Sequence, residues 1–243
     1  METINIVINS GKWIFREDNM RNFLRFEIDI FNILSSDSIS RKSTQNDIYK
    51  TRFIFRNKKE IYSPKHFHQE LLSKKVRSIS LVKNPKFETI PETPFDFDKV
   101  CSFQVDYQNK TRLWDMETIW YEDKWFMTFR ENSLKKVKHN NEDISECEIN
   151  LKNAVNAAID FSNKVECTLF IKDFENALKL LENQDCIEAA LFACVFSGMG
   201  SWNDIVYSIA EQRCLLSEYN KVTNSLFMSI MDIIGCFCRS IFY

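Results

Sequence analysis

Three residues in a basic stretch of the chain have the types and the spacing of a metal site. His66, His68 and Glu70 alternate along the sequence, so on a strand their side chains would share one face. Imidazole and carboxylate groups are common ligands of transition metals. Pro64 precedes the three residues, however, and His139 is the one further histidine. This context favours a solvated junction between a loop and a helix, and we expect no bound metal there.

A second group of charged residues follows an order found in metal-dependent nucleases. Glu122, Asp123 and Lys124 come after Asp106 and Asp115, which resembles an acid followed by E-x-K. The acids of such a site must converge on Mg²⁺ beside the edge of a sheet. A polar hairpin turn between two strands would contain the same triplet, and we expect the turn.

The sequence contains none of the loops that bind phosphate through glycines. Of the four glycines only Gly198 and Gly200 lie close together, and they fit neither G-x-G-x-x-G nor G-x-x-x-x-G-K-[ST]. There is no G-x-S-x-G for a serine nucleophile. The eight cysteines include no C-x-x-C pair, and Cys236 and Cys238 would point apart on a helix. We therefore expect a protein that is not an enzyme and that binds no metal or other cofactor.

The segment from Arg41 to Lys86 is basic and carries aromatic residues among its cations. It holds 13 Lys or Arg against three acidic residues. Bases stack on aromatic rings while phosphates pair with cations, so the pattern fits single-stranded nucleic acid. It also fits an acidic protein partner. The structural interpretation, which the pattern favours, is a strand with a solvated basic face and a buried aromatic face. The candidate partner-binding residues of this segment are Arg52, Arg56, Lys58 and Lys59.

The most distinctive string of the chain is G-M-G-S-W-N-D, from Gly198 to Asp204. Either glycine could end a helix in a left-handed conformation. Ser201 could cap the next helix, with Asp204 in the place of a capping-box acid. The functional interpretation is a partner-binding corner at which Trp202, Asn203 and Asp204 meet a protein partner.

This string also carries a resemblance. The stretch from Phe170 to Ile241, with its F-x-G-M-G-S-W-N-D pattern before a final helix, resembles a small family of uncharacterised bacterial helical domains. Some members of that family occur in toxin–immunity neighbourhoods. Ser197 departs from a glycine in the pattern. The resemblance implies a helical fold and an immunity-type role, provides no catalytic residues, and does not extend to residues 1–140.

The elements that would position these residues differ between the two halves of the chain. In the first half, hydrophobic periodicity predicts a helix over 18–34, and short alternating or aromatic runs predict strands. We expect a strand at 4–8, a hairpin of 52–56 with 60–62, a helical turn or two at 68–75, a strand at 77–82, and a meander of 100–107, 112–121 and 124–130. The face of the meander that carries Trp114 and Trp120 should pack on the helix at 18–34.

The second half of the chain is predicted to be helical throughout. All four prolines lie at or before Pro94, which leaves the rest free to form helices. The polar segment 135–148 should be a linker. The periodicity predicts helices over 149–163, 172–183, 186–196, 204–214 and 219–238, and the third is apolar all round and should be central. Short connections between them indicate an antiparallel bundle.

Charge separates the two halves as well. Residues 1–140 carry 25 Lys or Arg against 19 Asp or Glu, whereas residues 141–243 carry 7 against 15. We therefore predict a basic α+β domain over 1–140, with an antiparallel or mixed sheet, and an acidic helical domain over 141–243. The asymmetry could serve an anionic partner, or it could hold the two halves together.

These patterns favour a cytoplasmic interaction protein that is not an enzyme. There is no secretory signal, and the apolar stretch 226–243 is too short and too charged to span a bilayer. We expect a protein partner, and specifically an immunity-type role in which a charged patch binds and neutralises a cognate toxin. The alternative is a nucleic-acid-binding or regulatory protein that uses the basic segment 41–86.

Overall fold

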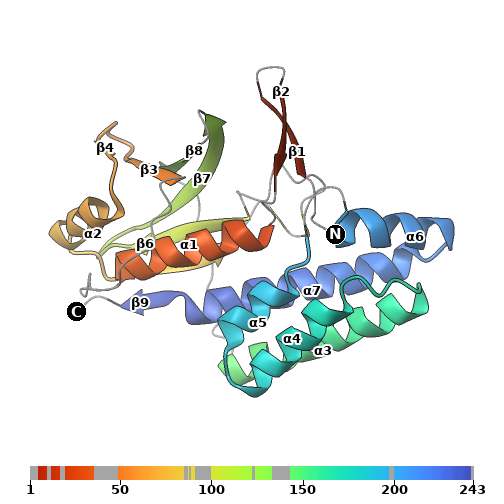
Figure 1. Cartoon of the computed structure of the whole chain (residues 1–243). Helices are drawn as coiled ribbons and strands as arrows, with labels where there is room; N and C mark the ends of the chain where they lie inside the picture. The colour runs from red at the N-terminus through yellow and green to blue at the C-terminus, as the bar shows by residue number, and fades with distance from the viewer. Residues whose placement is uncertain are drawn as a thin grey trace. The chain divides into compact units, whose positions relative to one another are not determined.

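The chain forms two compact units that are each assembled from several parts of the sequence. The computed structural model describes residues 5–9, 12–16, 20–35, 49–84, 87, 89–90, 100–121, 124–132, 143–196 and 200–241. Unit 1 consists of Met1–Arg25, Phe87–Phe97 and Asn141–Phe237. Unit 2 consists of Phe26–Lys86, Asp98–Asn140 and Cys238–Tyr243. Unit 2 carries a large sheet and unit 1 most of the helices, so the predicted α+β class is confirmed (Figure 1).

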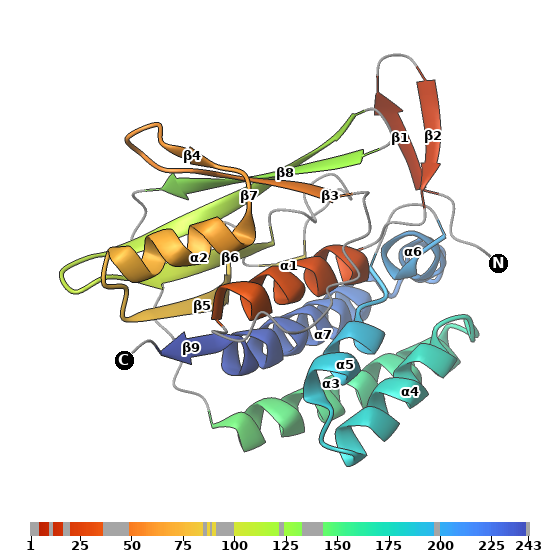
Figure 2. The ribbon, with the colours of Figure 1, turned by 60° about the vertical axis from the view of Figure 1, so that its left-hand side comes forward.

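The sheet of unit 2 has seven strands in the order β4-β3-β8-β7-β6-β5-β9. It is mixed, because β3 and β8 pair in parallel whereas the other neighbours are antiparallel. The predicted hairpin is β3 with β4, and the predicted meander is β6, β7 and β8 (Figure 2). The strands are β3 (Tyr49–Ile54), β4 (Glu60–Ile61), β5 (Ser78–Lys83), β6 (Cys101–Asp106), β7 (Thr111–Tyr121), β8 (Lys124–Asn132) and β9 (Arg239–Ile241).

Helix α2 (Pro64–Ser73) covers part of this sheet and starts earlier than the sequence predicts. Proline suits the first position of a helix, because its fixed φ is already helical and its missing N–H would have no partner there. Phe67 of α2 stacks on Phe53 at a centroid distance of 4.1 Å and meets the edge of Trp114 at 4.8 Å. The face that carries Trp114 therefore packs on α2, where the sequence suggests the helix at 18–34.

Unit 1 contains a helical bundle, as predicted. Helix α3 contacts α4, α5 and α7, and α5 contacts α3, α4 and α7, so the predicted central helix is no more central than α3. A two-stranded hairpin and the first turns of α1 (Met20–Ser35) also belong to this unit. The remaining elements are β1 (Asn5–Asn9), β2 (Lys12–Arg16), α3 (Ile144–Lys164), α4 (Ile171–Glu182), α5 (Cys186–Ala193), α6 (Tyr207–Gln212) and α7 (Leu216–Phe237).

Helix α3 begins inside the segment that the sequence predicts to be a linker. Asp143 caps it, because its side chain accepts a hydrogen bond from Ser145 N at 3.2 Å. After three of the helices the chain turns sharply without glycine. Glu166, Gln184 and Cys214, which follow α3, α4 and α6, all adopt positive φ. The next residue's N–H then reaches back to an earlier carbonyl, as Asp185 N does to Leu180 O at 2.9 Å.

Candidate functional site

The string from 198 to 204 forms a helix junction. Gly198 lies outside the described residues, and Gly200 has a φ of 83° and provides the left-handed turn. The preceding helix α5 already ends at Ala193, and the following one starts with a π-helical turn from Trp202 to Val206. Asp204 Oδ2 accepts a hydrogen bond from Gly200 N at 2.7 Å. The carboxylate thus acts as the expected capping acid, although it accepts from the N–H of Gly200 and not from that of Ser201.

Trp202 is fully buried, which corrects the interpretation of this string as an exposed partner-binding corner. Its indole N–H donates to Thr223 Oγ1 at 2.8 Å. Phe174 meets its ring edge-on at 5.4 Å, and Tyr219 stacks on it at 6.3 Å. The physical reason is the large apolar area of the indole, which the aromatic cluster removes from water.

The two residues after Trp202 remain more accessible. Asn203 is half-buried and accepts a hydrogen bond from Ser201 Oγ at 2.8 Å. Ser201 itself is buried and does not cap the following helix through its side chain. Asp204 is exposed, but its carboxylate is already used by Gly200 N. The side chains of this string therefore mainly stabilise the helix junction, and few of their polar groups remain for contacts with a partner.

Three of the four basic residues predicted to contact a partner have local structural roles. Arg52 donates two hydrogen bonds to the carboxylate of Glu60, and this interaction lowers the pKa of Glu60. Lys59 pairs with Glu70 at 2.5 Å. Lys58 is exposed and has a φ of 65°, because it makes the turn between β3 and β4. Arg56, the fourth, lines a pocket.

The two sets of candidate metal ligands are not brought together among the residues that the structure describes. His66 is exposed on α2 and His68 is buried, since residues two apart on a helix point in different directions. Asp106 accepts hydrogen bonds from Ser78 Oγ and Thr111 Oγ1, at 2.9 and 2.6 Å. Glu122 and Asp123 lie outside the described part of the chain, as does His139.

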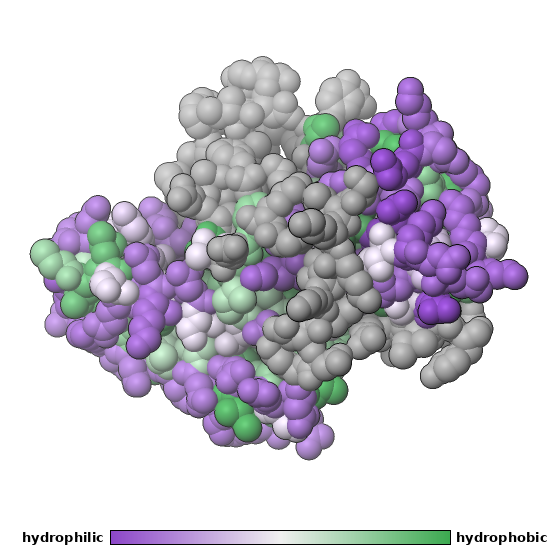
Figure 3. All heavy atoms as spheres, turned by 180° about the vertical axis from the view of Figure 1, so that it is seen from behind, coloured by the Kyte–Doolittle hydropathy of each residue, from purple (hydrophilic) through white to green (hydrophobic). Residues whose placement is uncertain are grey.

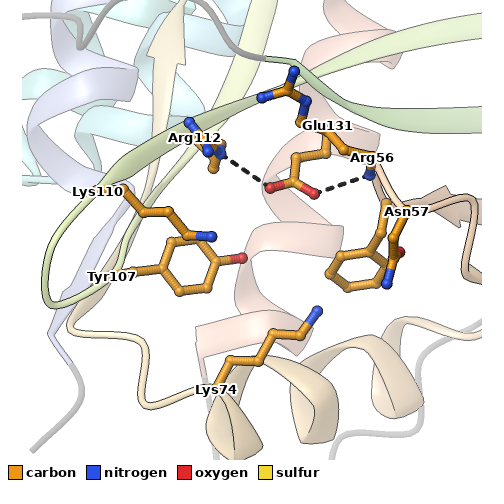
Figure 4. A pocket seen from close by; sticks show the side chains of 8 residues that line it. Arg56, Asn57, Lys74, Tyr107, Lys110, Arg112 and Glu131 are labelled. Atoms are coloured by element: carbon orange, nitrogen blue, oxygen red, sulfur yellow. Dashed lines mark hydrogen bonds and ion pairs between the residues drawn. The ribbon is translucent and has the colours of Figure 1, made fainter.

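A pocket of about 410 Å³ lies in unit 2 at one end of the sheet (Figure 4). The turn after β3, the C-terminal end of α2, the β6–β7 turn and the end of β8 all contribute to its wall. We call it the basic pocket, because four of its eight lining residues are cationic and one is acidic. The lining residues are Phe55, Arg56, Asn57, Lys74, Tyr107, Lys110, Arg112 and Glu131.

The single carboxylate of the basic pocket, Glu131, is held at one side. Its Oε2 accepts a hydrogen bond from Arg56 N at 3.1 Å, and its Oε1 lies 3.3 Å from Arg112 Nε. That Nε is buried and makes no hydrogen bond within the described part of the chain, so the contact is an ion pair of poor hydrogen-bond angle. Charge attraction therefore holds Arg112 in place more than a directed bond does.

Two lysines of the basic pocket lie over aromatic rings. Lys74 Nζ is 3.6 Å from the centroid of Phe55, and Lys110 Nζ is 5.2 Å from the centroid of Tyr107. Lys74 also pairs with Glu70, at 3.1 Å, whereas no described carboxylate lies within ion-pair distance of Lys110. Cation–π contacts fix an ammonium group without cancelling its charge. The pocket thus keeps a positive potential.

Tyr107 provides a neutral donor beside these cations. Its hydroxyl points into the pocket in Figure 4. Burial raises the pKa of Tyr107 well above its ordinary value, and the charge of Glu131 raises it further. The hydroxyl therefore stays protonated at neutral pH and can donate a hydrogen bond. Together the Tyr107 hydroxyl and the surrounding cations can receive an anionic group.

The sequence pointed to Arg56 but not to the rest of the basic pocket. Lys74 belongs to the basic segment 41–86, and Lys110 lies between the predicted strands 100–107 and 112–121. Nothing in their spacing relates them to Arg112 or Glu131. The pairing of β3 with β8 and of β8 with β7 brings these residues together, and that order is a long-range property.

A second cavity of about 400 Å³ is lined by the β6–β7 turn and shares Tyr107 and Lys110 with the basic pocket. Arg77 adds a further cation, but the Asp106 carboxylate lines the cavity too. The basic pocket therefore has the larger excess of positive charge.

Comparison of the chain with protein-family models, curated proteins and solved structures finds no match. Among the described residues, no helix has both the length and the apolar character needed to cross a membrane. Nor do the described residues contain a cluster of three His, Cys, Asp or Glu side chains that could hold a metal ion.

Proposed function

We propose that this chain is a non-enzymatic interaction protein whose basic pocket binds an acidic segment of a partner protein. The observation that carries the proposal is the pocket itself, in which Arg56, Lys74, Lys110 and Arg112 surround a concave space with one carboxylate. Cations collected in a concave site focus the electrostatic field, so they raise both the rate and the selectivity of association with an acidic partner.

The rest of the described surface gives a second line of support. On the face shown in Figure 3, hydrophilic side chains predominate and apolar ones lie scattered among them. Most of the exposed large apolar residues come from different parts of the chain, for example Tyr62, Ile119, Ile149 and Leu169. Isolated apolar residues of this kind are normal on a soluble surface. Charge is therefore the more distinctive property that a partner could recognise.

A defined acidic peptide tests the proposal. We expect a fluorescein-labelled peptide of alternating Glu and Ser to bind the full chain, with fluorescence anisotropy as the readout. The double variant Arg56→Glu/Lys110→Glu should weaken binding by about tenfold or more, because two attractive charges become repulsive. The matched control Lys50→Glu/Lys65→Glu makes the same charge change at exposed residues of unit 2 outside the pocket.

Equal weakening by the two double variants would contradict the proposal, because binding would then depend on net charge and not on the pocket. Circular dichroism of each variant should match that of the wild type, since all four residues are exposed. A variant that has lost its fold would show a changed spectrum and would be replaced by the glutamine version of the same pair.

The narrower form of the proposal is an immunity-type protein that neutralises a cognate toxin. It is supported by the resemblance of residues 170–241 to helical domains from toxin–immunity neighbourhoods. Co-expression with the product of a neighbouring toxin-like gene should restore growth of the host, and the Arg56→Glu/Lys110→Glu variant should fail to do so. If the wild type and the variant restore growth equally, the pocket is not the toxin-binding surface.

The alternative is a nucleic-acid-binding protein, and the cationic lining of the basic pocket is the observation that favours it. A labelled single-stranded oligonucleotide, titrated at low salt, decides between the two. Phosphate contacts are strongest at low salt, so absence of binding there would reject this alternative.

A further inference from the structure

The basic pocket presents hydrogen-bond donors from several directions. In Figure 4 the Tyr107 hydroxyl and the ammonium groups of Lys74 and Lys110 point toward a common space, with Arg112 beside them. A carboxylate presents two oxygens. A phosphate monoester presents three terminal oxygens in a tetrahedral arrangement, each a strong acceptor.

The charges in the pocket also favour a ligand with more than one negative charge. Glu131 compensates Arg112 at 3.3 Å, and Glu70, outside the lining, compensates Lys74 at 3.1 Å. Lys110 and Arg56 have no carboxylate of the described part of the chain within ion-pair distance. These two cations suit a ligand with two negative charges better than a ligand with one.

We propose that the basic pocket binds the dianionic phosphate of a phosphate monoester, so that the acidic partner carries a phosphorylated side chain. This inference rests on the proposed function, and it narrows the chemistry of the ligand at the same site. Lys110 and Arg56 supply the two positive charges that the phosphate needs, and Tyr107 donates to one of its oxygens. Lys74 and Arg112, which are already paired with Glu70 and Glu131, add further donors beside it. The turn residue Asn57 also lines the pocket.

The dianion could be carried by a protein or by a small molecule, and a set of probes separates the two. The probes are a phosphoserine peptide, the same peptide with glutamate at that position, the unmodified serine peptide, and glycerol phosphate, each titrated into the full chain by calorimetry. We expect the phosphoserine peptide to bind about tenfold more tightly than the glutamate peptide. Equal binding of glycerol phosphate and the phosphoserine peptide would support the dianion site and assign it to a small molecule.

The pH dependence provides a readout that is specific for phosphate. The second pKa of a phosphate monoester is about 6, so its affinity should fall between about pH 7.5 and pH 5 as the dianion gains a proton. A glutamate carboxylate keeps its charge over most of that range. The Lys110→Gln and Tyr107→Phe variants should each weaken binding of the phosphoserine peptide severalfold, and Lys65→Gln should not.

Two results would overturn the inference, and they differ in whether the proposed function also fails. If the phosphoserine and glutamate peptides bind equally and with the same pH dependence, the phosphate site is refuted, while the binding of an acidic partner stands. If none of the peptides binds, the proposed function fails together with the inference.

A separate observation in unit 1 concerns two cysteines. Cys147 in the first turn of α3 and Cys236 in the last turn of α7 have their sulfur atoms 2.9 Å apart. Neither is in a disulfide, and Cys147 is buried whereas Cys236 is half-buried. A disulfide needs a sulfur–sulfur distance near 2.05 Å, so small rotations about the side-chain bonds would suffice.

We infer that Cys147 and Cys236 form a disulfide when a hydroperoxide is present, and that this bond links the start of α3 to the end of α7. The peroxide oxidises the more accessible Cys236 to a sulfenic acid and releases one water molecule. The Cys147 thiol then attacks that sulfur, and a second water leaves. Two thiols thus lose two electrons and two protons, and the hydrogen peroxide is reduced to two water molecules.

Peptide mapping after treatment with hydrogen peroxide tests this inference. The test uses a Cys214→Ser background, because Cys214 is exposed and could link two molecules. We expect one peptide pair joining Cys147 to Cys236, and a thermal midpoint that is higher by about 5 °C and returns on reduction. The additional variant Cys236→Ser should show neither. Recovery of Cys147 as a free thiol after Cys236 has been oxidised would overturn the inference.

Discussion

Trp202 places a polar N–H inside an aromatic cluster, and Thr223 accepts its hydrogen bond at 2.8 Å. The residue is distinctive in the sequence, yet its function is to hold α7 against the junction that precedes it. Sequence reasoning could recognise the string from 198 to 204 but could not decide whether the indole is exposed. That depends on Phe174 and Tyr219, which lie well before and after it in the chain.

Replacing the acceptor measures what this hydrogen bond contributes. Thr223→Val leaves the shape of the side chain nearly unchanged but leaves the buried indole N–H without its partner. We expect the free energy of unfolding to fall by about 1–3 kcal/mol. Urea unfolding followed by tryptophan fluorescence measures it. Thr223→Ser keeps a hydroxyl at this place and should recover much of the loss, and equal losses in both variants would show that the methyl group matters instead.

The pair of Arg25 and Glu188 makes a pH-dependent contribution in unit 1. Two hydrogen bonds of 2.7 Å from the guanidinium hold the pKa of Glu188 below its usual range. Because this pKa is lowered, the pair stabilises the fold above the ordinary pKa of glutamate, and the contribution disappears as the pH falls through the lowered value. Both side chains are partly exposed, at 44% and 33%, so solvent screening reduces it to about 0.5 kcal/mol.

Glu188→Gln should therefore lower the free energy of unfolding by about 0.5 kcal/mol at neutral pH and by almost nothing near pH 3. Denaturant unfolding of the variant and the wild type at both pH values provides the comparison. A difference that is the same at both values would show that packing, and not charge, is responsible.

At the scale of elements, local sequence patterns predicted the β3–β4 hairpin, the β6–β8 meander and the helices of unit 1. These elements depend on hydrophobic period and turn chemistry within short windows. The parallel pairing of β3 with β8 and the addition of β9 beside β5 could not be predicted, because they join segments far apart in the sequence. The basic pocket depends on that same order of strands, which explains why only Arg56 was identified beforehand.

Helix ends in this chain carry an unusual choice of residue. Gln184 has a φ of 61° after α4, in a conformation that glycine adopts without steric cost. Gln184→Gly should therefore raise the free energy of unfolding by about 0.5–1 kcal/mol. Glu175→Gly, in the exposed middle of the same helix, is the matched control and should lower it by about 1 kcal/mol. Destabilisation by both changes would contradict the left-handed turn at 184.

At the scale of the whole molecule, the charge of the chain is unevenly distributed along its sequence. Residues 1–140 are rich in Lys and Arg, and residues 141–243 in Asp and Glu. The basic pocket lies in unit 2 and draws its cations from the first of these stretches. A partner that carries acidic groups would therefore be attracted before contact is made.

This distribution predicts a strong dependence of binding on salt. The affinity of the full chain for the acidic peptide should fall by about tenfold between 50 and 300 mM NaCl. At higher salt, counterions shorten the distance over which exposed charges attract each other. Anisotropy titrations at several salt concentrations measure the change. An affinity that is independent of salt would indicate an apolar contact surface.

The most direct test of the central claim is a map of where the acidic peptide binds. Backbone amide signals of the isotope-labelled chain would be followed by nuclear magnetic resonance during titration with the phosphoserine peptide. We predict that the largest shifts occur at residues 55–57, 74, 107–112 and 131, and that they are lost in Arg56→Glu/Lys110→Glu. Shifts confined to α3–α7, with these residues unchanged, would contradict the assignment of the basic pocket as the binding site.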